Sequence, residues 1–391
     1  MNNDELQVLG TENRKNNNRK WIVAIACVVL TIVCYLIYNR CSSTGNTLPM
    51  SQEGSTISPA LQHAADSLLN DKLTEINGLQ GQVIVMNVQT GEILAMVGRE
   101  RNFEGKFQPC QNFAYQQELG SLMKTASLLV ALETGEVKLS DVVDVGNGIW
   151  QIDDDRIMKD HNWRRGGYGE VTLDRALEVS SNIGISKTIW SLFKGHEQDY
   201  FNKLDSMSFG QPNNIEGIEG LHSSVYNSPK DSDWVNKDIL WSAIGYDRKI
   251  APIQMLTFYN AIANNGKMVK PTLIPDNTEV INEQIAKSEN VTSMQQTLEH
   301  VVSQGVGRNA GSDRIKVAGK TGTSQVNEYY EGDNTVSEYH LAFCGYFPAD
   351  KPKYSMIVSL NKLGLPASSV IMAGNAFSNI VEWMIDNGMM K

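Results

Sequence analysis

The sequence predicts an α+β fold in which an antiparallel β-sheet is flanked by helices. Helical and strand-like segments alternate along the chain without the regular strand–helix–strand spacing that a parallel sheet requires. Three strand-like runs, 315–324, 340–348 and 353–362, follow one another near the C-terminus without a helix between them. A composition of 41% apolar and 20% charged residues is that of an ordinary globular protein.

The N-terminal segment predicts a membrane anchor. Residues 21–39 carry no charge, and this run is about long enough to cross a bilayer as a helix at about 1.5 Å per residue. Basic residues concentrate in 1–20, and only Arg40 follows the run closely, which predicts a cytoplasmic tail and a single-pass protein of the cytoplasmic membrane with its remaining domain outside. A cleaved signal peptide is the alternative, although no small-x-small cleavage site follows. Residues 40–58 are rich in Ser, Thr and Gly and predict a flexible linker.

The elements of the domain predicted over 59–391 are expected in the following order. A helix begins after Pro59, and two apolar runs around a glycine-containing turn predict a β-hairpin over 82–98. Helical periodicity then predicts a helix over 118–135, helical segments over 171–193 with a break near Ser181–Gly184, and a helix from Pro252 to Gly266. The three strand-like runs follow, and a helix over 368–388 closes the chain.

Charge and cysteine content exclude several function classes. The chain has 44 acidic and 34 basic residues, for a net charge of −10, and no basic run interleaved with aromatics that would predict a nucleic-acid partner. There is no Cys-x-x-Cys or His-x-x-x-His pattern, so we expect neither a metal site nor a cofactor. The acidic run 153–155 is typical of a solvated loop. Whether Cys110 and Cys344 form a disulfide is left open.

Three Ser-x-x-Lys pairs can be separated by their context. Ser359 lies in a strand-like run, where residues three apart point to opposite faces. Ser191 lies at the end of a helical segment, where a following lysine is ordinary for a helix C-terminus. Ser121 instead follows Gly120 at a predicted helix start, where residues i and i+3 share a face.

The Ser121 pair has the residue types of a nucleophile and its base. A helix N-terminus stabilises developing negative charge, and the Lys124 amine can reach the hydroxyl at this spacing. If burial and a second cation keep that amine partly neutral, it can accept the serine proton. Spacing alone leaves open the alternative that the pair is the polar edge of an ordinary helix.

Two further motifs make the pattern specific. Lys-Thr-Gly occurs once, at 320–322, after an apolar run, where the glycine would let a ligand lie against a strand edge. Ser-x-Asn occurs at Ser180, Ser288 and Ser359, and only the first two of these lie between Ser121 and Lys320. Ser288 lies in a polar stretch, whereas Ser180 lies where a helical segment breaks, a position that can project side chains into a cleft.

The ordered set Ser-x-x-Lys, Ser-x-Asn and Lys-Thr-Gly resembles the signature of penicillin-binding proteins and serine β-lactamases. The chain is most similar to the monofunctional class B penicillin-binding proteins. Beyond the motifs, the resemblance covers about 55–391 and includes the segments 83–97, 167–187, 243–274, 317–325 and 343–358. Residues 40–120 leave no room for the pedestal domain that class B proteins usually carry before the first motif, so we expect it to be lacking.

The resemblance implies a role for each matching residue. Ser121 would be the acylated nucleophile, Lys124 its general base, Ser180 the proton donor to the leaving group, Asn182 a ligand of the substrate amide and Lys320 an electrostatic support for Ser180; Thr321, Gly322 and Thr323 would bind the substrate or a β-lactam. The backbone N–H groups of Ser121 and Thr323 would form the oxyanion hole. The family has proline before the glycine of the first motif, whereas Leu119 stands here.

The implied activity is that of a peptidoglycan D,D-transpeptidase that cross-links D-Ala–D-Ala stem peptides through a serine acyl-enzyme and is inhibited covalently by β-lactams. A lipid II polymerase of the shape, elongation, division and sporulation family is the candidate partner. A β-lactamase, a β-lactam sensor, a D,D-carboxypeptidase and a catalytically silent scaffold are the alternatives on the same fold. The physiological role, in elongation, division or a specialised process, and the stem-peptide chemistry are left open.

Overall fold

The structure is a computed structural model that describes residues 54–211, 214–331 and 334–390. The predicted tail, membrane segment and most of the predicted linker lie outside these ranges, and within them no helix is long and apolar enough to span a bilayer. The last residues before the domain are attached to it. Thr56 N donates to Leu273 O at 3.0 Å, and Ser58 N donates to Leu94 O at 2.9 Å.

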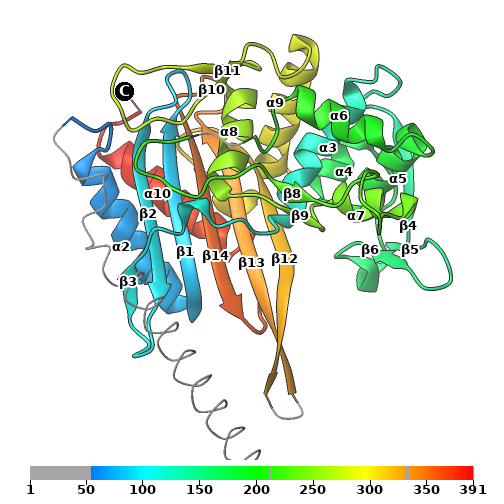
Figure 1. Cartoon of the computed structure of the whole chain (residues 1–391), viewed down its shortest axis with the longest axis horizontal. Coiled ribbons are helices and arrows are strands. Elements are labelled where there is room, and N and C mark those ends of the chain that lie inside the picture. Colours follow the sequence, from blue (N-terminus) through cyan, green and yellow to red (C-terminus); the bar gives the residue numbers. More distant parts are fainter. Residues whose placement is uncertain (1–53, 212–213, 332–333, 391) are drawn as a thin grey trace, which may run out of the picture. The chain divides into compact units, whose positions relative to one another are not determined.

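A six-stranded antiparallel sheet forms the centre of the described domain (Figure 1). Its order is β12 (Ala318–Glu331), β13 (Asn334–Phe347), β14 (Tyr354–Leu363), β1 (Gly78–Asn87), β2 (Ile93–Arg101) and β3 (Phe107–Pro109). The sheet confirms the predicted fold class. The hairpin β1–β2 confirms the strand pair predicted over 82–98, and Gly91 in its turn has a φ of +78°, which glycine adopts at little cost.

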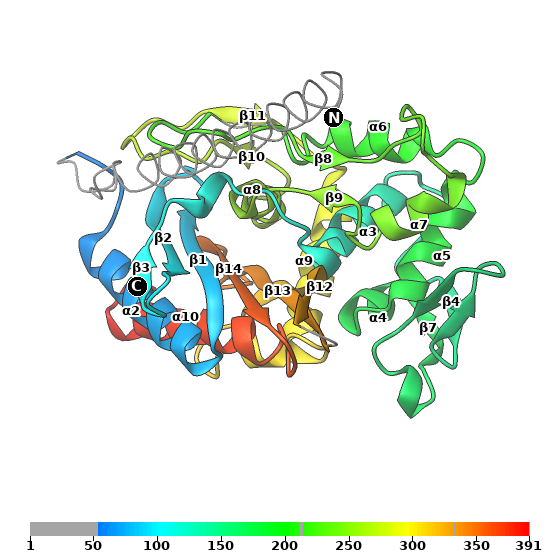
Figure 2. The ribbon, with the colours of Figure 1, turned by 60° about the horizontal axis from the view of Figure 1, so that its bottom comes forward.

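Two helices from opposite ends of the chain cover one face of the sheet. These are α2 (Pro59–Glu75), capped by the Ser58 side chain, and α10 (Met372–Asp386), which lie on the same side in Figure 2. Alternate residues of β1, such as Val83 and Val85, point into the core that these helices share with β13 and β14. The Phe377 ring of α10 lies 4.6 Å from that of Phe343 and 5.7 Å from that of Phe347.

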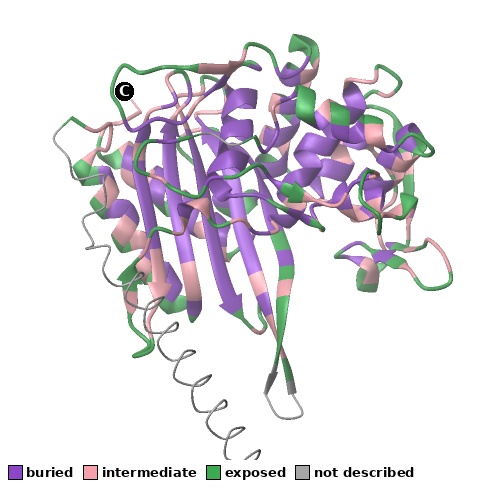
Figure 3. Ribbon diagram, in the orientation of Figure 1, coloured by how far each residue is buried: buried purple, intermediate pink, exposed green. Residues whose placement is uncertain are grey.

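The helix α8 (Pro252–Ala263) covers the opposite face and is buried over its whole length (Figure 3). Beyond it, a helical region packs beside β12. It contains α3 (Met123–Leu132), α4 (Leu173–Glu178), α5 (Asn182–Phe193), α6 (Gln198–Ser206), α7 (Ile239–Ser242) and α9 (Ser288–Ser303). Four short two-stranded sheets pair β4 (Val142–Gly146) with β7 (Gly169–Thr172), β5 (Ile149–Gln151) with β6 (Ile157–Lys159), β8 (Val225–Tyr226) with β9 (Arg248–Lys249) and β10 (Met268–Val269) with β11 (Val280–Asn282).

Several observed boundaries differ from those predicted from the sequence. The strand predicted over 315–324 begins at Ala318 and continues to Glu331, because β12 pairs with β13 far beyond the apolar run. The helix predicted over 118–135 starts as the 3-10 turn η3 (Gly120–Leu122) before α3. The break predicted near Ser181–Gly184 falls slightly earlier, between α4 and α5. Cys110 and Cys344 are both free.

Candidate active site

The three motifs meet at one cleft between β12 and the helical region. The cleft has a volume of about 350 Å³. Five of the predicted site residues line it: Ser121, Ser180, Asn182, Thr321 and Thr323. Lys124 and Lys320 lie beneath its floor with 0% of their surface exposed. Segments about 200 positions apart in sequence are therefore brought together, as the ordered motifs predict.

The turn that carries Ser121 is fastened to β12 by close backbone approach. Gly120 has a φ of +53°, and a Cβ atom at this position would lie 2.6 Å from Thr323 O. A Cβ atom at Gly322 would lie 2.4 Å from Leu119 O. Ser324 Oγ also donates to Glu118 O at 2.6 Å. Only glycine permits this contact, which sets the Ser121 and Thr323 backbone segments against each other.

Lys124 is held as a buried amine whose charge is suppressed. Its Nζ donates to Ser180 O at 2.7 Å and to Ser180 Oγ at 3.2 Å, and within the described residues it makes no hydrogen bond to Ser121 Oγ. Burial lowers the pKa of Lys124 to about 7, although the negative charge of Asp160 opposes this shift. A large fraction of this lysine is therefore neutral near pH 7 and able to accept a proton.

Ser180 joins the two lysines. Lys320 Nζ donates to Ser180 Oγ at 2.8 Å, so both amines share one hydroxyl oxygen. Burial, and then the charge of Lys124, lower the pKa of Lys320 well below its usual value. The Ser180 backbone has a φ of +56°, an uncommon conformation for a residue other than glycine. The break between α4 and α5 thus aims this hydroxyl at the cleft and at both amines.

Sequence reasoning missed Asp160, which positions the second motif. Its side chain is 1% exposed and accepts hydrogen bonds from Ser181 Oγ at 2.7 Å, Asn182 N at 2.6 Å and Ile183 N at 3.1 Å. A carboxylate at a helix N-terminus satisfies amide groups that have no partner within the helix. No local capping pattern signals this residue, because it acts from about twenty positions upstream of α5.

Asn182 and His161 lie on the same wall. Asn182 Nδ2 donates to Lys159 O at 2.8 Å, which fixes the side-chain amide in place. His161 lines the cleft, and its Nε2 lies 3.0 Å from Tyr168 Oη. Burial lowers the pKa of His161, with a smaller contribution from the charge of Lys124.

The opposite wall is the edge strand β12. An edge strand has backbone groups without a partner in the sheet, so it can bind an extended peptide. Thr323 Oγ1 donates to Ser369 Oγ at 2.8 Å, and the segment 367–370 closes this end of the cleft. Ser369 carried no recognisable signal in the sequence, because it lies in a loop outside the three motifs.

The other serines that match Ser-x-x-Lys or Ser-x-Asn lie outside the cleft. Ser191 Oγ donates to Thr188 O at 2.8 Å within α5, and Ser359 Oγ lies 2.7 Å from His340 Nε2 inside the sheet. Ser288 is exposed at the start of α9. The contexts that separated these serines from Ser121 and Ser180 are therefore confirmed.

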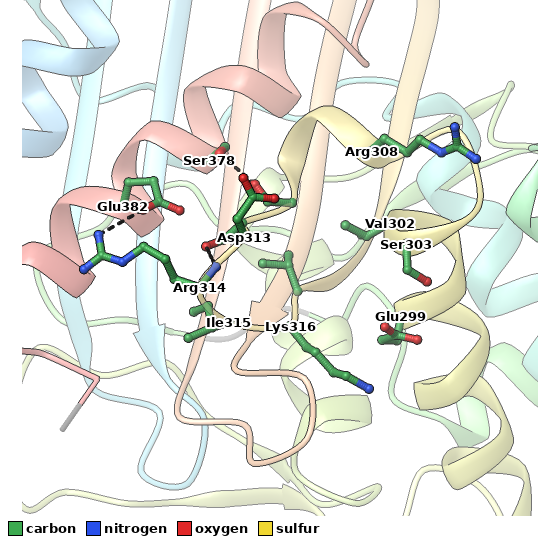
Figure 4. Close-up of a pocket in the computed structure, with 13 residues that line it drawn as sticks. Glu299, Val302, Ser303, Arg308, Asp313, Arg314, Ile315, Lys316, Ser378 and Glu382 are labelled. Carbon is green, nitrogen blue, oxygen red and sulfur yellow. Dashed lines mark hydrogen bonds and ion pairs between the residues drawn. The ribbon is translucent and has the colours of Figure 1, made fainter.

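A larger cavity, of about 730 Å³, lies away from this chemistry, between α9, α10 and the segment that leads into β12 (Figure 4). Arg314, on its wall, pairs with Glu382 at 3.1 Å and with Asp386 at 2.6 Å. None of the predicted site residues lines this cavity. Of these two cavities, the smaller cleft is the candidate active site because the predicted nucleophile lines it and buried amines of lowered pKa lie next to it.

Comparisons with known proteins agree with this geometry. The family model of the penicillin binding protein transpeptidase domain matches residues 81–382. The chain is 26% identical over 318 residues to stage V sporulation protein D of Bacillus subtilis (strain 168), covering 76% of this chain and 47% of that protein. It is 24% identical over 324 residues to peptidoglycan D,D-transpeptidase FtsI of Escherichia coli (strain K12), covering 78% of this chain and 51% of that protein.

A solved structure shows the same fold. The transpeptidase domain of penicillin-binding protein 3 from Burkholderia pseudomallei superposes with a TM-score of 0.73 at 23% identity, covering 86% of this chain and 97% of that domain. The chain spans about half the length of the curated relatives it matches. Because the family model covers most of the chain and the three motifs meet in one cleft, the chain belongs to the penicillin binding protein transpeptidase domain family.

Proposed function

We propose that the protein is a peptidoglycan D,D-transpeptidase that acts through an acyl-enzyme at Ser121. The observation that carries this proposal is the shared Ser180 hydroxyl, 3.2 Å from the Lys124 amine and 2.8 Å from the Lys320 amine, in a cleft that Ser121 also lines. Two buried amines with lowered pKa around one hydroxyl form a route for moving a proton between the nucleophile and a leaving amine.

The reaction proceeds in two acyl transfers. Neutral Lys124 accepts the proton of Ser121 Oγ as this oxygen attacks the carbonyl carbon of the penultimate D-Ala. The N–H groups of Ser121 and Thr323 stabilise the resulting oxyanion. The C–N bond then breaks, and terminal D-Ala leaves with a proton delivered through Ser180. The amine of a second stem peptide attacks the acyl-enzyme, returns a proton along the same route and frees Ser121.

The surroundings of the reaction complete the proposal. The hydrophobic run 21–39 would anchor the chain in the cytoplasmic membrane with the catalytic domain outside, where peptidoglycan lies. A membrane-bound lipid II polymerase would supply the glycan strand that carries the stem peptides. Cysteine labelling of the intact chain in membranes tests the orientation: reagents that do not cross the membrane should reach a cysteine introduced near residue 50 and not one introduced near residue 10.

The first test uses the 391-residue chain in mild detergent, a fluorescent penicillin and a denaturing gel. Wild type should acquire a covalent label that persists for many minutes. Ser121→Ala should acquire none, whereas Ser191→Ala, which alters another Ser-x-x-Lys serine, should label normally. A label lost within seconds would identify a β-lactamase. Label on Ser121→Ala would overturn the nucleophile assignment by showing another nucleophile. No label on wild type would also overturn it and would favour a silent scaffold.

Product analysis separates the remaining alternatives. With a D-Ala–D-Ala peptide and an acceptor amine, a transpeptidase gives the cross-linked product. A D,D-carboxypeptidase gives only the hydrolysed peptide, because water takes the place of the acceptor. A β-lactam sensor is acylated by penicillin and releases no D-Ala from the peptide.

A further inference from the structure

Two cationic side chains lie over the Trp163 ring on the helical side of the cleft, and a third cation, Arg165, follows in the same turn. Lys159 ends β6, and Arg164 and Arg165 belong to the 3-10 turn η4 (Trp163–Arg165). Lys159 Nζ lies 4.7 Å from the centre of the Trp163 ring, and the guanidinium carbon of Arg164 lies 4.8 Å from it. An indole face attracts cations, so the ring holds both charges within a small area. We call Lys159, Trp163, Arg164 and Arg165 the basic cluster.

The cations of the basic cluster are available to a ligand. All three are exposed, and among the described residues none forms an ion pair. Nearby cations differ: Arg156 pairs with Asp153 at 2.9 Å, and Arg175 pairs with Glu178 at 2.7 Å. In a chain of net charge −10, three adjacent cations without carboxylate partners present a local positive surface.

The basic cluster is joined to the catalytic wall through its backbone. The same Lys159 carbonyl that holds the Asn182 amide belongs to the cluster, and Trp163 N donates to Asp160 O at 3.1 Å. His161, between these residues, lines the cleft itself. The positive charge of Arg165 is among the causes, after burial, that lower the pKa of His161. The cluster therefore adjoins the wall of the cleft that carries Asn182 and His161, just outside the residues that line the cleft.

We propose that the basic cluster binds carboxylate groups of the peptide that acylates Ser121, on the part of that peptide before its D-Ala–D-Ala end. This assignment rests on the proposed transpeptidase function. A guanidinium group can bind a carboxylate through two parallel N–H···O bonds, and the Lys159 ammonium adds a further donor. The terminal carboxylate is expected at Thr321 and Thr323 on the other wall, so the cluster recognises a second, separate set of anionic groups.

The test compares two donor peptides on the 391-residue chain in mild detergent. Both end in D-Ala–D-Ala; one carries free side-chain carboxylates before this end, and the other carries carboxamides at the same positions. Release of D-Ala gives kcat/KM for each. Wild type should prefer the carboxylate peptide about fivefold at low salt, and added salt should reduce this preference because it screens exposed charges. Arg164→Gln/Arg165→Gln should lower the preference to below about twofold, with Lys159 as the remaining donor.

Matched controls separate recognition from folding. Arg308→Gln/Lys316→Gln removes two exposed cations beside the cavity of Figure 4 and should keep the wild-type preference. Labelling by fluorescent penicillin should be equally fast in wild type and in Arg164→Gln/Arg165→Gln. A further control keeps the carboxamide donor and places the carboxylates on the acceptor peptide instead. The rate should then be the same in wild type and in Arg164→Gln/Arg165→Gln, because the basic cluster is proposed to bind the donor peptide.

The possible results separate the cluster assignment from the proposed function. An equal preference in wild type and Arg164→Gln/Arg165→Gln, or no preference in wild type, overturns the cluster assignment, while D-Ala release from the carboxamide peptide leaves the transpeptidase proposal standing. If wild type reacts with neither peptide nor penicillin, the proposed function fails. Equilibrium binding of the two peptides to Ser121→Ala then tests the cluster without turnover, and equal affinities overturn it.

Discussion

The lowered pKa of Lys124 predicts how the rate of Ser121 acylation depends on pH. Only the neutral amine can accept the serine proton, so the rate should follow the neutral fraction of Lys124. With a pKa of about 7, about one tenth of Lys124 is neutral at pH 6, about half at pH 7 and about nine tenths at pH 8. The rate should rise roughly tenfold from pH 6 to a plateau above pH 8.

The size of this effect comes from burial. A lysine with the ordinary pKa of 10.5 would be only about 0.03% neutral at pH 7, so burial raises the neutral fraction more than about a thousandfold. Desolvation disfavours the ammonium form, because Lys124 has no exposed surface and hydrogen-bonds to uncharged atoms of Ser180. Asp160 limits the shift, since its negative charge stabilises the ammonium form.

The assay is stopped-flow or gel-based measurement of penicillin acylation between about pH 5.5 and pH 9, with circular dichroism to confirm folding at each pH. Lys316→Gln, which removes an exposed lysine outside the cleft, should give the wild-type profile. A rate that increases tenfold per pH unit through pH 9 without a plateau would show an ordinary lysine pKa. A rate independent of pH would show that Lys124 is not the base.

Four substitutions test the architecture of the site and core through urea unfolding and penicillin labelling. Asp160→Ala leaves three donors without their acceptor and should cost about 2–4 kcal/mol in unfolding free energy, together with most of the acylation rate; an unchanged midpoint would contradict its positioning role. Gly322→Ala would place a Cβ atom 2.4 Å from a backbone oxygen, so it should lower both the unfolding free energy and the acylation rate. Gly374→Ala in α10 is the matched control: the nearest atom is 3.4 Å from the new Cβ, and the substitution should stabilise the fold by about 0.5–1 kcal/mol. Phe377→Ala should cost about 3–5 kcal/mol through the cavity it leaves, and a cost below about 1 kcal/mol would show that the core collapses around it.

The positions of the motif residues could be predicted from the sequence because their signals are local, and their expected roles came from the family resemblance. Ser121 and Lys124 share a helix face, Ser180 lies at a break between helical segments, and Lys320 lies on a strand just after an apolar run. Periodicity and turn residues act over a few positions, so they are visible without knowledge of the fold. The same local patterns predicted the antiparallel sheet and most of its flanking helices.

The sequence by itself determined the class of fold, the order of the motifs and the residue types on which the proposed acyl transfer depends. Tertiary structure decided that Lys124 is buried and makes its hydrogen bonds to Ser180, that Asp160 holds the second motif, and that Ser369 meets Thr323. It also placed three cations of 159–165, which have no carboxylate partner among the described residues, next to the wall of the cleft in an acidic chain. These properties depend on desolvation and on charges from segments distant in sequence, and both arise only when the chain packs.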